Sequence, residues 1–353
     1  MALLEYANFT VPDVVKKSIP SFYSQNPLLE AMRKRNKVIR SGGTNVQVPR
    51  IMSGHSDISE LNGTNLEIPL AKKETFDYIF GDWARFVKPI ILPHIDRDRM
   101  QSNEDKKRWV QDTTTAVMQS FQNSVARQMF VGDVANLSGF GTLNGFQTGG
   151  TSNGFVNGAL SFTTPAAQSA AGTQYMNLAR TQDLVDDQNN WYNQYIAHTG
   201  FAGTYLAVAE ELKMTADSFA EDSEGVSIGM TSIANHVEIG DAIRTYGTMS
   251  GLMYRPEDLE KGLAQKTIHI VNGVKYYNSR FMNDGRISVA GNEYVYLLNP
   301  NGISYYVNAN NDFRVTKFTS HLEHGNMDAD VGYVFLETQL AVHQILIQAC
   351  TSK

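Results

Sequence analysis

The chain has 353 residues, of which 42% are hydrophobic and 19% charged, and its formal net charge at pH 7 is −6. This length is enough to bury a sizeable core, in one large domain or in two entwined ones. The acidic balance argues against a protein that coats nucleic acid, because such domains carry basic stripes. The single cysteine, Cys350, excludes an intrachain disulfide framework and indicates a reducing compartment.

The first residues, MALLEYANFTVPDVVKK, lack a basic start and a long apolar run. We therefore expect no secretory signal and, in the chain as a whole, no membrane span. Three prolines punctuate residues 1–36, and no clean period is visible there, which predicts an extended or weakly helical arm or else a frayed terminus. Within this arm, residues 27–35 can form a helical turn or two with Leu28, Leu29 and Met32 on one face.

Two alternating runs lie at the ends of residues 45–80. Val46 and Val48 alternate with Asn45 and Gln47 in the first run, and Phe76, Tyr78 and Phe80 alternate with Thr75 and Asp77 in the second. This period predicts two half-buried strands that pair as a long hairpin over residues 37–92. The residues between the runs are mostly polar, Gly and Pro, and an isolated ribbon of this kind is at best marginally stable. The ribbon must therefore reach for another surface.

The strongest helix signal covers residues 102–131. Ser102 and Asp105 have the spacing of a capping box, and acidic residues occupy the first turn, where the helix dipole favours them. At about 1.5 Å per residue the helix would be on the order of 40 Å long. Its apolar face, which we expect to rest on the C-terminal strands, comprises Val110, Val117, Phe121, Val125 and Met129.

Residues 134–179 contain no charged side chain and are rich in Gly, Ser, Thr and Asn. A disordered linker is one interpretation. Recurring phenylalanines favour the other, an ordered glycine-rich crossing with a mobile stretch near 147–154. Residues 173–187 then show a helical face formed by Tyr175, Leu178, Gln182 and Val185.

The rest of the chain is mainly β. NQYIAHTGFAGTYLAVAEELKM reads as a strand, a turn and a helix, and two strands flank Asn272-Gly273, a strong hairpin signal. NEYVYLLNPNGISYYV is a strand, turn and strand, and VGYVFLETQLAVHQILIQAC is apolar on both phases, as in a strand buried on both faces. The fold class is therefore α+β.

Catalytic, cofactor and metal motifs are not recognisable. GFGTLNG lacks the spacing of a dinucleotide loop, and there is no Walker loop. His321 and His324 flank Glu323 without the spacing of a zinc helix. His198 is interpreted as a polar residue at a strand end, and Cys350 as a core residue. We expect no enzyme, no cofactor and no metal.

The order of these parts resembles a tailed-phage major capsid protein of the HK97-like fold. The resemblance rests on order and spacing, with GFGTLNGF, YIAHTGFAGTYLAVAEEL, IVNGVKYYNSRFMNDG and NEYVYLLNPNGISYYV following the long helix. It implies an N-arm at 1–36, an extended E-loop hairpin at 37–92, and a P-domain at 93–172 with the spine helix at 102–131. It further implies an A-domain at 173–310 and, at 311–353, C-terminal strands that return to the P-domain.

The same resemblance implies self-assembly through pentamers and hexamers into an icosahedral head. The head would enclose double-stranded DNA without sequence-specific binding, assemble in the host cytoplasm and persist in the virion. No long helical pro-segment precedes the arm, so a separate scaffold protein and a portal are the expected partners. The ribbon would reach the neighbouring subunit, and its candidate contacts are Arg40, Arg50, Asp57, Glu60, Glu67, Lys72 and Lys73.

Other functions stay open on the sequence. An encapsulin-like cargo compartment would keep the fold but hold a cargo protein. A β-rich enzyme such as a glycoside hydrolase would need paired carboxylates, for which Glu210 and Glu337 are available without a recognisable context. A fibre or tail component would form elongated trimers.

Overall fold

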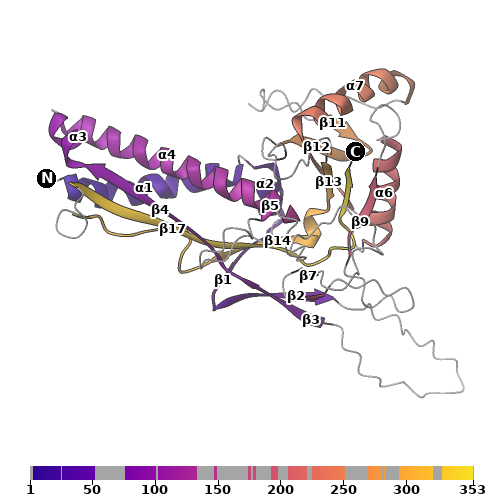
Figure 1. Ribbon diagram of the computed structural model, residues 1–353, viewed down its shortest axis with the longest axis horizontal. Helices are drawn as coiled ribbons and strands as arrows, with labels where there is room; N and C mark the ends of the chain where they lie inside the picture. Colours follow the sequence, from indigo (N-terminus) through magenta and orange to yellow (C-terminus); the bar gives the residue numbers. More distant parts are fainter. Residues whose placement is uncertain are drawn as a thin grey trace, which may run out of the picture.

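The computed structural model describes residues 3–24, 26–51, 76–100, 102–132, 147–148, 174–175, 178–179, 192–197, 206–220, 225–250, 269–279, 282, 294–320 and 328–352. Within these residues, two six-stranded sheets organise the chain (Figure 1). The fold is α+β, as the sequence predicts, and its strands come both before and after one long helix.

The first body is elongated and combines long strands with long helices. Its sheet contains β1 (Val38–Ser41), β4 (Ala84–Pro93), β14 (Ile303–Asn308), β15 (Arg314–Val315), β16 (Thr319–Ser320) and β17 (Ala329–Val342). β17 pairs with β4 along one edge and with β14, β15 and β16 in turn along the other. The helices of this body are α1 (Leu3–Ser24), α2 (Pro27–Lys34), α3 (His94–Arg99) and α4 (Asn103–Phe130).

The second body holds the other six-stranded sheet, in the order β11-β12-β10-β13-β18-β9. These strands are β9 (Gln194–Ala197), β10 (Ile228–Thr231), β11 (His269–Val271), β12 (Val274–Asn278), β13 (Tyr294–Leu298) and β18 (Ala349–Ser352). Helices α6 (Leu206–Ser218) and α7 (Ile233–Ser250) pack on it, and the 3-10 turn η5 (Pro300–Gly302) leads from β13 to β14. Residues 303–308, expected in the A-domain, thus pair in the first sheet, and residues 349–352 pair in the second.

The smaller sheets have two strands each. β2 (Asn45–Ile51) pairs with β3 (Phe76–Asp82), and β5 (Val131–Gly132) pairs with β6 (Gln147–Thr148). β7 (Gln174–Tyr175) pairs antiparallel with β8 (Leu178–Ala179). This pairing contradicts the helical face predicted from Tyr175 and Leu178, because the two residues face each other across a short hairpin.

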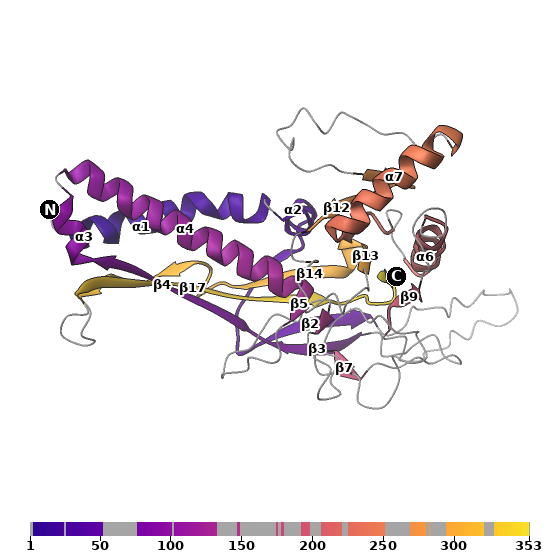
Figure 2. The same cartoon turned by 45° about the horizontal axis from the view of Figure 1, so that its top comes forward.

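α4 confirms the helix predicted at 102–131. Ser102 Oγ accepts a hydrogen bond from the backbone N–H of Asp105 at 3.0 Å, which is the N-cap half of a capping box, and donates one to the Asp105 carboxylate at 2.6 Å. The predicted face is buried in the subunit, in one core cluster with residues of α1, β4 and the C-terminal strand β17. The helices α1 and α4 lie side by side on one side of β4 and β17, and the β2–β3 ribbon lies on the other (Figure 2).

The N-terminal residues correct the prediction of an extended or weakly helical arm. Residues 3–24 form the helix α1, which contains Pro12 and Pro20. Its apolar residues Ala7, Val11 and Val15 are buried because they face α4. Tertiary burial of this face outweighs the helix-breaking effect of the prolines.

The short helix α2 confirms the prediction for residues 27–35. Asn26 caps it by accepting a hydrogen bond from Leu28 N at 3.0 Å, and Leu28, Leu29 and Met32 are buried.

An aromatic cluster joins α1, α4 and the turn that precedes β15. Phe313 packs edge to face on Phe22 at 5.1 Å and on Phe121 at 6.3 Å between ring centroids. Tyr23 adjoins Phe22 and Tyr305, and its burial, with Asp312 nearby, raises the pKa of Tyr23 to about 12. Such ring contacts add about 0.5–1.5 kcal/mol each beyond area burial, so this cluster holds the first body together.

Candidate assembly surfaces

The β2–β3 ribbon exposes aromatic side chains on one of its faces. Val48 and Ile79 are cross-strand partners and are both buried. On the opposite face Tyr78 is 53% exposed and Phe80 is 39% exposed. The pairing of the two runs is therefore confirmed. The prediction that Tyr78 and Phe80 lie on the buried face of the strand is wrong. Ile79 points inward, opposite Val48, so the two aromatic side chains lie on the other face of β3.

The root of the ribbon is tied to the first body. The indole Nε1 of Trp83 donates to the carbonyl of Gly43 at 3.0 Å, and Gln339 Nε2 on β17 donates to the carbonyl of Asp82 at 2.5 Å. Gly43 has φ +107°, a conformation that favours glycine. These bonds fix the direction in which the ribbon leaves the sheet.

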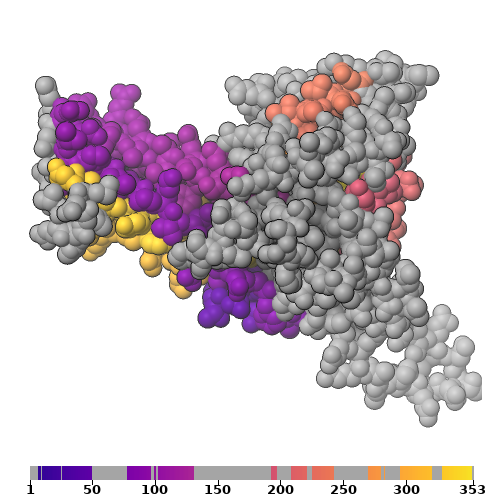
Figure 3. All heavy atoms as spheres, in the orientation of Figure 1, coloured from indigo at the N-terminus to yellow at the C-terminus, as the bar shows by residue number. Residues whose placement is uncertain are grey.

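A second apolar surface lies on the β4–β17 strands, on the face away from α1 and α4. We call it the outer face, and it consists of Val87, Pro89, Ile91, Tyr333 and Phe335. Val87 is 45% exposed and Ile91 37% exposed, whereas Ile90 and Leu92, on the helix side, are fully buried. Figure 3 shows α4, β4 and β17 together at one end of the molecule.

Charged groups border the outer face. Arg314 lies over the ring of Phe335 at 5.3 Å, and Arg85 Nε pairs with Glu337 at 2.9 Å. Exposed apolar patches rimmed by polar groups mark interaction sites more often than random surface. The sequence did not single out this surface, because both phases of β4 and β17 are apolar and either could have faced the core.

The charged residues proposed as intersubunit contacts are placed only in part. Arg40 Nη2 lies 2.7 Å from Asp312 Oδ2 of the same subunit, and the Arg40 side chain is 71% exposed. Arg50 belongs to β2. Asp57, Glu60, Glu67, Lys72 and Lys73 lie outside the described residues. Their role as contacts stays a prediction.

The carboxylates considered for catalysis do not form a pair. Glu337 binds Arg85 and accepts a hydrogen bond from Asn308 Nδ2 at 2.7 Å, while Glu210 is exposed on α6 in the second body. Cys350 is buried and accepts a hydrogen bond from Asn193 Nδ2 at 3.2 Å, as expected of a core residue. His198, His321, Glu323 and His324 lie outside the described residues.

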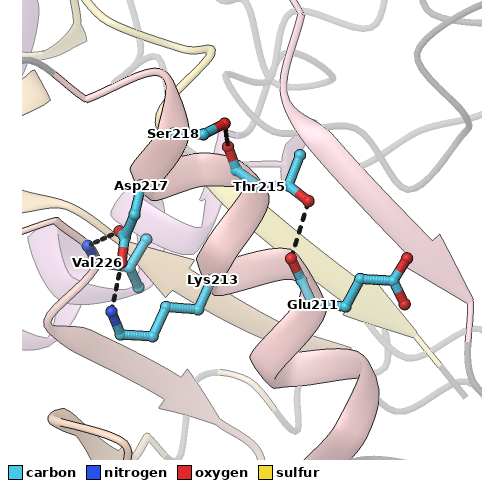
Figure 4. Close-up of polar contacts among 6 residues, drawn as sticks. All are labelled: Glu211, Lys213, Thr215, Asp217, Ser218 and Val226. Atoms are coloured by element: carbon cyan, nitrogen blue, oxygen red, sulfur yellow. Dashed lines mark hydrogen bonds and ion pairs between the residues drawn. The ribbon is translucent and has the colours of Figure 1, made fainter.

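Lys213 and Asp217 on α6 could suggest an acid–base pair, but their contacts are structural (Figure 4). Asp217 pairs with Lys213 one turn away and accepts a hydrogen bond from Val226 N at 2.7 Å. Gly225, with φ +56°, leaves the space that this carboxylate fills. Asp217 therefore anchors the segment that enters β10.

In the described ranges, His, Cys, Asp and Glu side chains form no group of three or more that could hold a metal ion. None of the described helices is long and apolar enough to cross a membrane.

His343, at the end of β17, is the titratable group with the clearest pH consequence. Burial, with a smaller contribution from Lys37, lowers the pKa of His343 to about 4. Below pH 6.5 the unfolded chain protonates this residue while the folded chain does not, so the free energy of unfolding falls until the pH reaches about 4.

As the pH falls from 6.5 to 4, we expect protonation of His343 in the unfolded chain to lower the free energy of unfolding by up to about 3 kcal/mol. Denaturant melts of the wild type and His343→Gln at several pH values measure the difference. The variant should show a shallower loss of stability over that window. Parallel pH profiles for both proteins would refute this assignment.

Comparison with known proteins gives no matching family model and no matching curated relative. Solved structures do match. The chain superposes on a capsid protein of cyanophage A-1(L) with a TM-score of 0.56 and 14% identity, covering 90% of this chain and 89% of that one. It also matches the capsid of a native GTA particle with a TM-score of 0.50 and 12% identity, over 91% and 89% of the two chains.

The chain has the HK97-like capsid fold. A further match with this fold is the SrpI encapsulin of Synechococcus elongatus, with a TM-score of 0.50 and 12% identity over 92% of this chain and 87% of that one. In this HK97-like chain, α4 covers the residues predicted as the spine helix, and β2 and β3 pair within the residues predicted as the E-loop hairpin, whose role as an E-loop stays a prediction. The exact domain boundaries stay predictions.

Proposed function

We propose that this chain is the repeating subunit of a closed protein shell, with a structural and not a catalytic role. The observation that carries the proposal is the pair of exposed apolar surfaces on an HK97-like fold. Tyr78 and Phe80 lie on the ribbon, and Val87 and Ile91 lie on the outer face. A subunit that projects one such surface and presents another can join copies head to tail. Contacts of this type close into rings when the rotation between neighbouring copies permits it.

In its specific form, we propose the major capsid protein of a phage head. Pentamers and hexamers would form an icosahedral shell around double-stranded DNA, with a separate scaffold protein and a portal as partners. Assembly would take place in the host cytoplasm and the protein would remain in the virion. The match to a cyanophage capsid supports this form, and the net charge of −6 is compatible with DNA that must pack and leave freely.

The intersubunit contact that we propose places the aromatic face of the ribbon on the outer face of a neighbour. Phe80 and Tyr78 would cover Val87, Ile91 and Phe335 of the next copy. Full burial of a large apolar side chain contributes roughly 1.5–3 kcal/mol. Because each aromatic ring is already about half buried, we expect about 1–2 kcal/mol from each at the contact.

The double variant Tyr78→Ser and Phe80→Ser tests this contact. The subunit should still fold but lose roughly 2 kcal/mol of stability, because each ring is about half buried in the subunit and half burial of a large apolar side chain contributes about 1 kcal/mol. Assembly should weaken at least tenfold, because about 1.4 kcal/mol per contact corresponds to a factor of ten. Light scattering and negative-stain images against protein concentration measure the effect.

Met214→Ser is the matched control, because Met214 is 64% exposed on α6, away from both surfaces. It should assemble at wild-type concentrations. Wild-type assembly of the double variant would refute the proposed contact. A wild-type chain that remains a compact monomer, with and without a scaffold or crowding agent, would refute the shell itself.

An encapsulin-like compartment is the second candidate, favoured by the match to the SrpI encapsulin. The contents of purified particles distinguish the two. Nuclease-protected DNA supports the phage head, and a co-purifying enzyme in particles without DNA supports the compartment.

A further inference from the structure

Two segments of the chain, residues 294–308 and 338–352, run antiparallel to each other through both sheets. In the first sheet β14 pairs with β17 up to Ile303 opposite Val342, and in the second β13 pairs with β18 up to Leu297 opposite Ala349. Residues 298–302 and 343–348, which we call the corner, connect these two ladders. The corner is thus where the chain passes twice from one body to the other.

One side chain continues the ladder through the corner. Gln348 Oε1 accepts a hydrogen bond from Asn299 N at 2.8 Å, and Gln348 Nε2 donates to Asn299 O at 3.0 Å. Both residues are fully buried. Since a glutamine amide carries the same donor and acceptor as a peptide group, it pairs with the Asn299 backbone as a neighbouring strand would.

The rest of the corner leaves little room for another arrangement. Asn299 Oδ1 accepts from Asn301 N at 2.9 Å, and the carbonyl of Gly302 accepts from His343 N at 3.0 Å and Gln344 N at 3.3 Å. A Cβ atom on Gly302 would lie 2.7 Å from Gln348 Nε2 and 2.9 Å from Ile347 Cδ1. The polar groups of Gln348 are therefore both satisfied and tightly enclosed.

We propose that Gln348 is a positioning residue that sets the angle between the two sheets. A buried amide that loses its partners costs free energy, so rotation of one sheet against the other is opposed as long as Gln348 holds Asn299. The consequence for assembly rests on the proposed shell function. Because subunit shape determines the curvature of a shell built from it, the corner would determine particle diameter.

The angle can be measured on the unassembled subunit. Spin labels at Lys107→Cys on α4 and Glu211→Cys on α6, in a Cys350→Ala background, report the distance between the two bodies, and both labelled positions are exposed. We expect one narrow distance distribution with Gln348 present. Gln348→Leu, which fills similar space without the hydrogen bonds, should broaden or shift it.

Gly302→Ala provides a second variant, because its added methyl group must displace the Gln348 amide from the other side. Val274→Ala, in the core of the second sheet, is the control for stability loss alone, since Val274 is 1% exposed and lies outside the corner. If Val274→Ala lowers the melting temperature as much as the two corner variants do, it should still show the narrow distribution of distances between the spin labels.

The proposal is overturned if Gln348→Leu or Gly302→Ala, whichever folds, keeps the wild-type distribution, or if Val274→Ala broadens it equally. Negative-stain images of assembled Gln348→Leu should then show a wider spread of particle diameters than the control. If the wild type forms no shell, the proposed function fails, while the distance measurement still decides whether Gln348 sets the angle.

Discussion

Phe121→Ala should lower the free energy of unfolding by about 3–5 kcal/mol. The Phe121 side chain is 3% exposed at the middle of α4, and its ring packs on Phe313 in the aromatic cluster. Removal of the ring leaves a cavity that the flanking helices cannot close. This loss is a large share of a typical domain's 5–15 kcal/mol, so the variant should be insoluble or melt early. Denaturant melts measure it.

Lys107→Ala is the matched control on the same helix. Lys107 is exposed in the first turns of α4, and its removal should change stability by less than about 0.5 kcal/mol. If Phe121→Ala melts like the wild type while shells fail to form, then the apolar face of α4 contacts a neighbouring subunit. That outcome would contradict its placement in the core.

Deletion of residues 53–66 should give a folded subunit that assembles poorly. These residues are mostly polar and contain glycine, and the ladder from Asn45 opposite Asp82 to Ile51 opposite Phe76 lies entirely outside them. Folding should therefore tolerate the loss, whereas contacts to a neighbour through Asp57 or Glu60 would be removed. Thermal melts and particle counts at matched protein concentration separate the two effects.

The companion variant is the full-length chain with Asp57→Ala and Glu60→Ala. If those two carboxylates carry the contact, this variant should assemble as poorly as the deletion. If the deleted chain misfolds, the loop packs on its own subunit, and the E-loop interpretation fails.

Local signals in the sequence predicted several elements correctly. Ser102 and Asp105 marked the start of α4, and the hydrogen bonds between them are present. Asn272-Gly273 predicted the β11–β12 hairpin, in which both residues have positive φ, 49° and 80°. Capping and tight turns depend on residues within a few positions of each other, so they can be read without the rest of the chain.

Signals that depend on distant partners were less reliable. Pro12 and Pro20 suggested that no long helix forms, yet α1 gains enough buried apolar surface against α4 to persist. The phase of β3 was predicted wrongly because both Ile79 and its aromatic neighbours can occupy a core. Only the register that places Ile79 opposite Val48 decides which of them is exposed.

The sequence by itself determined the α+β class, the long helix, the pairing at the ends of the ribbon and the absence of a recognisable catalytic motif. Each of these follows from periodicity, caps or turn residues within a short window. The tertiary structure alone decided that the ribbon exposes Tyr78 and Phe80, that β4 and β17 present an outer apolar face, and that Gln348 holds the corner. These features join segments up to hundreds of residues apart, and the faces of a strand become distinct only when a partner covers one of them.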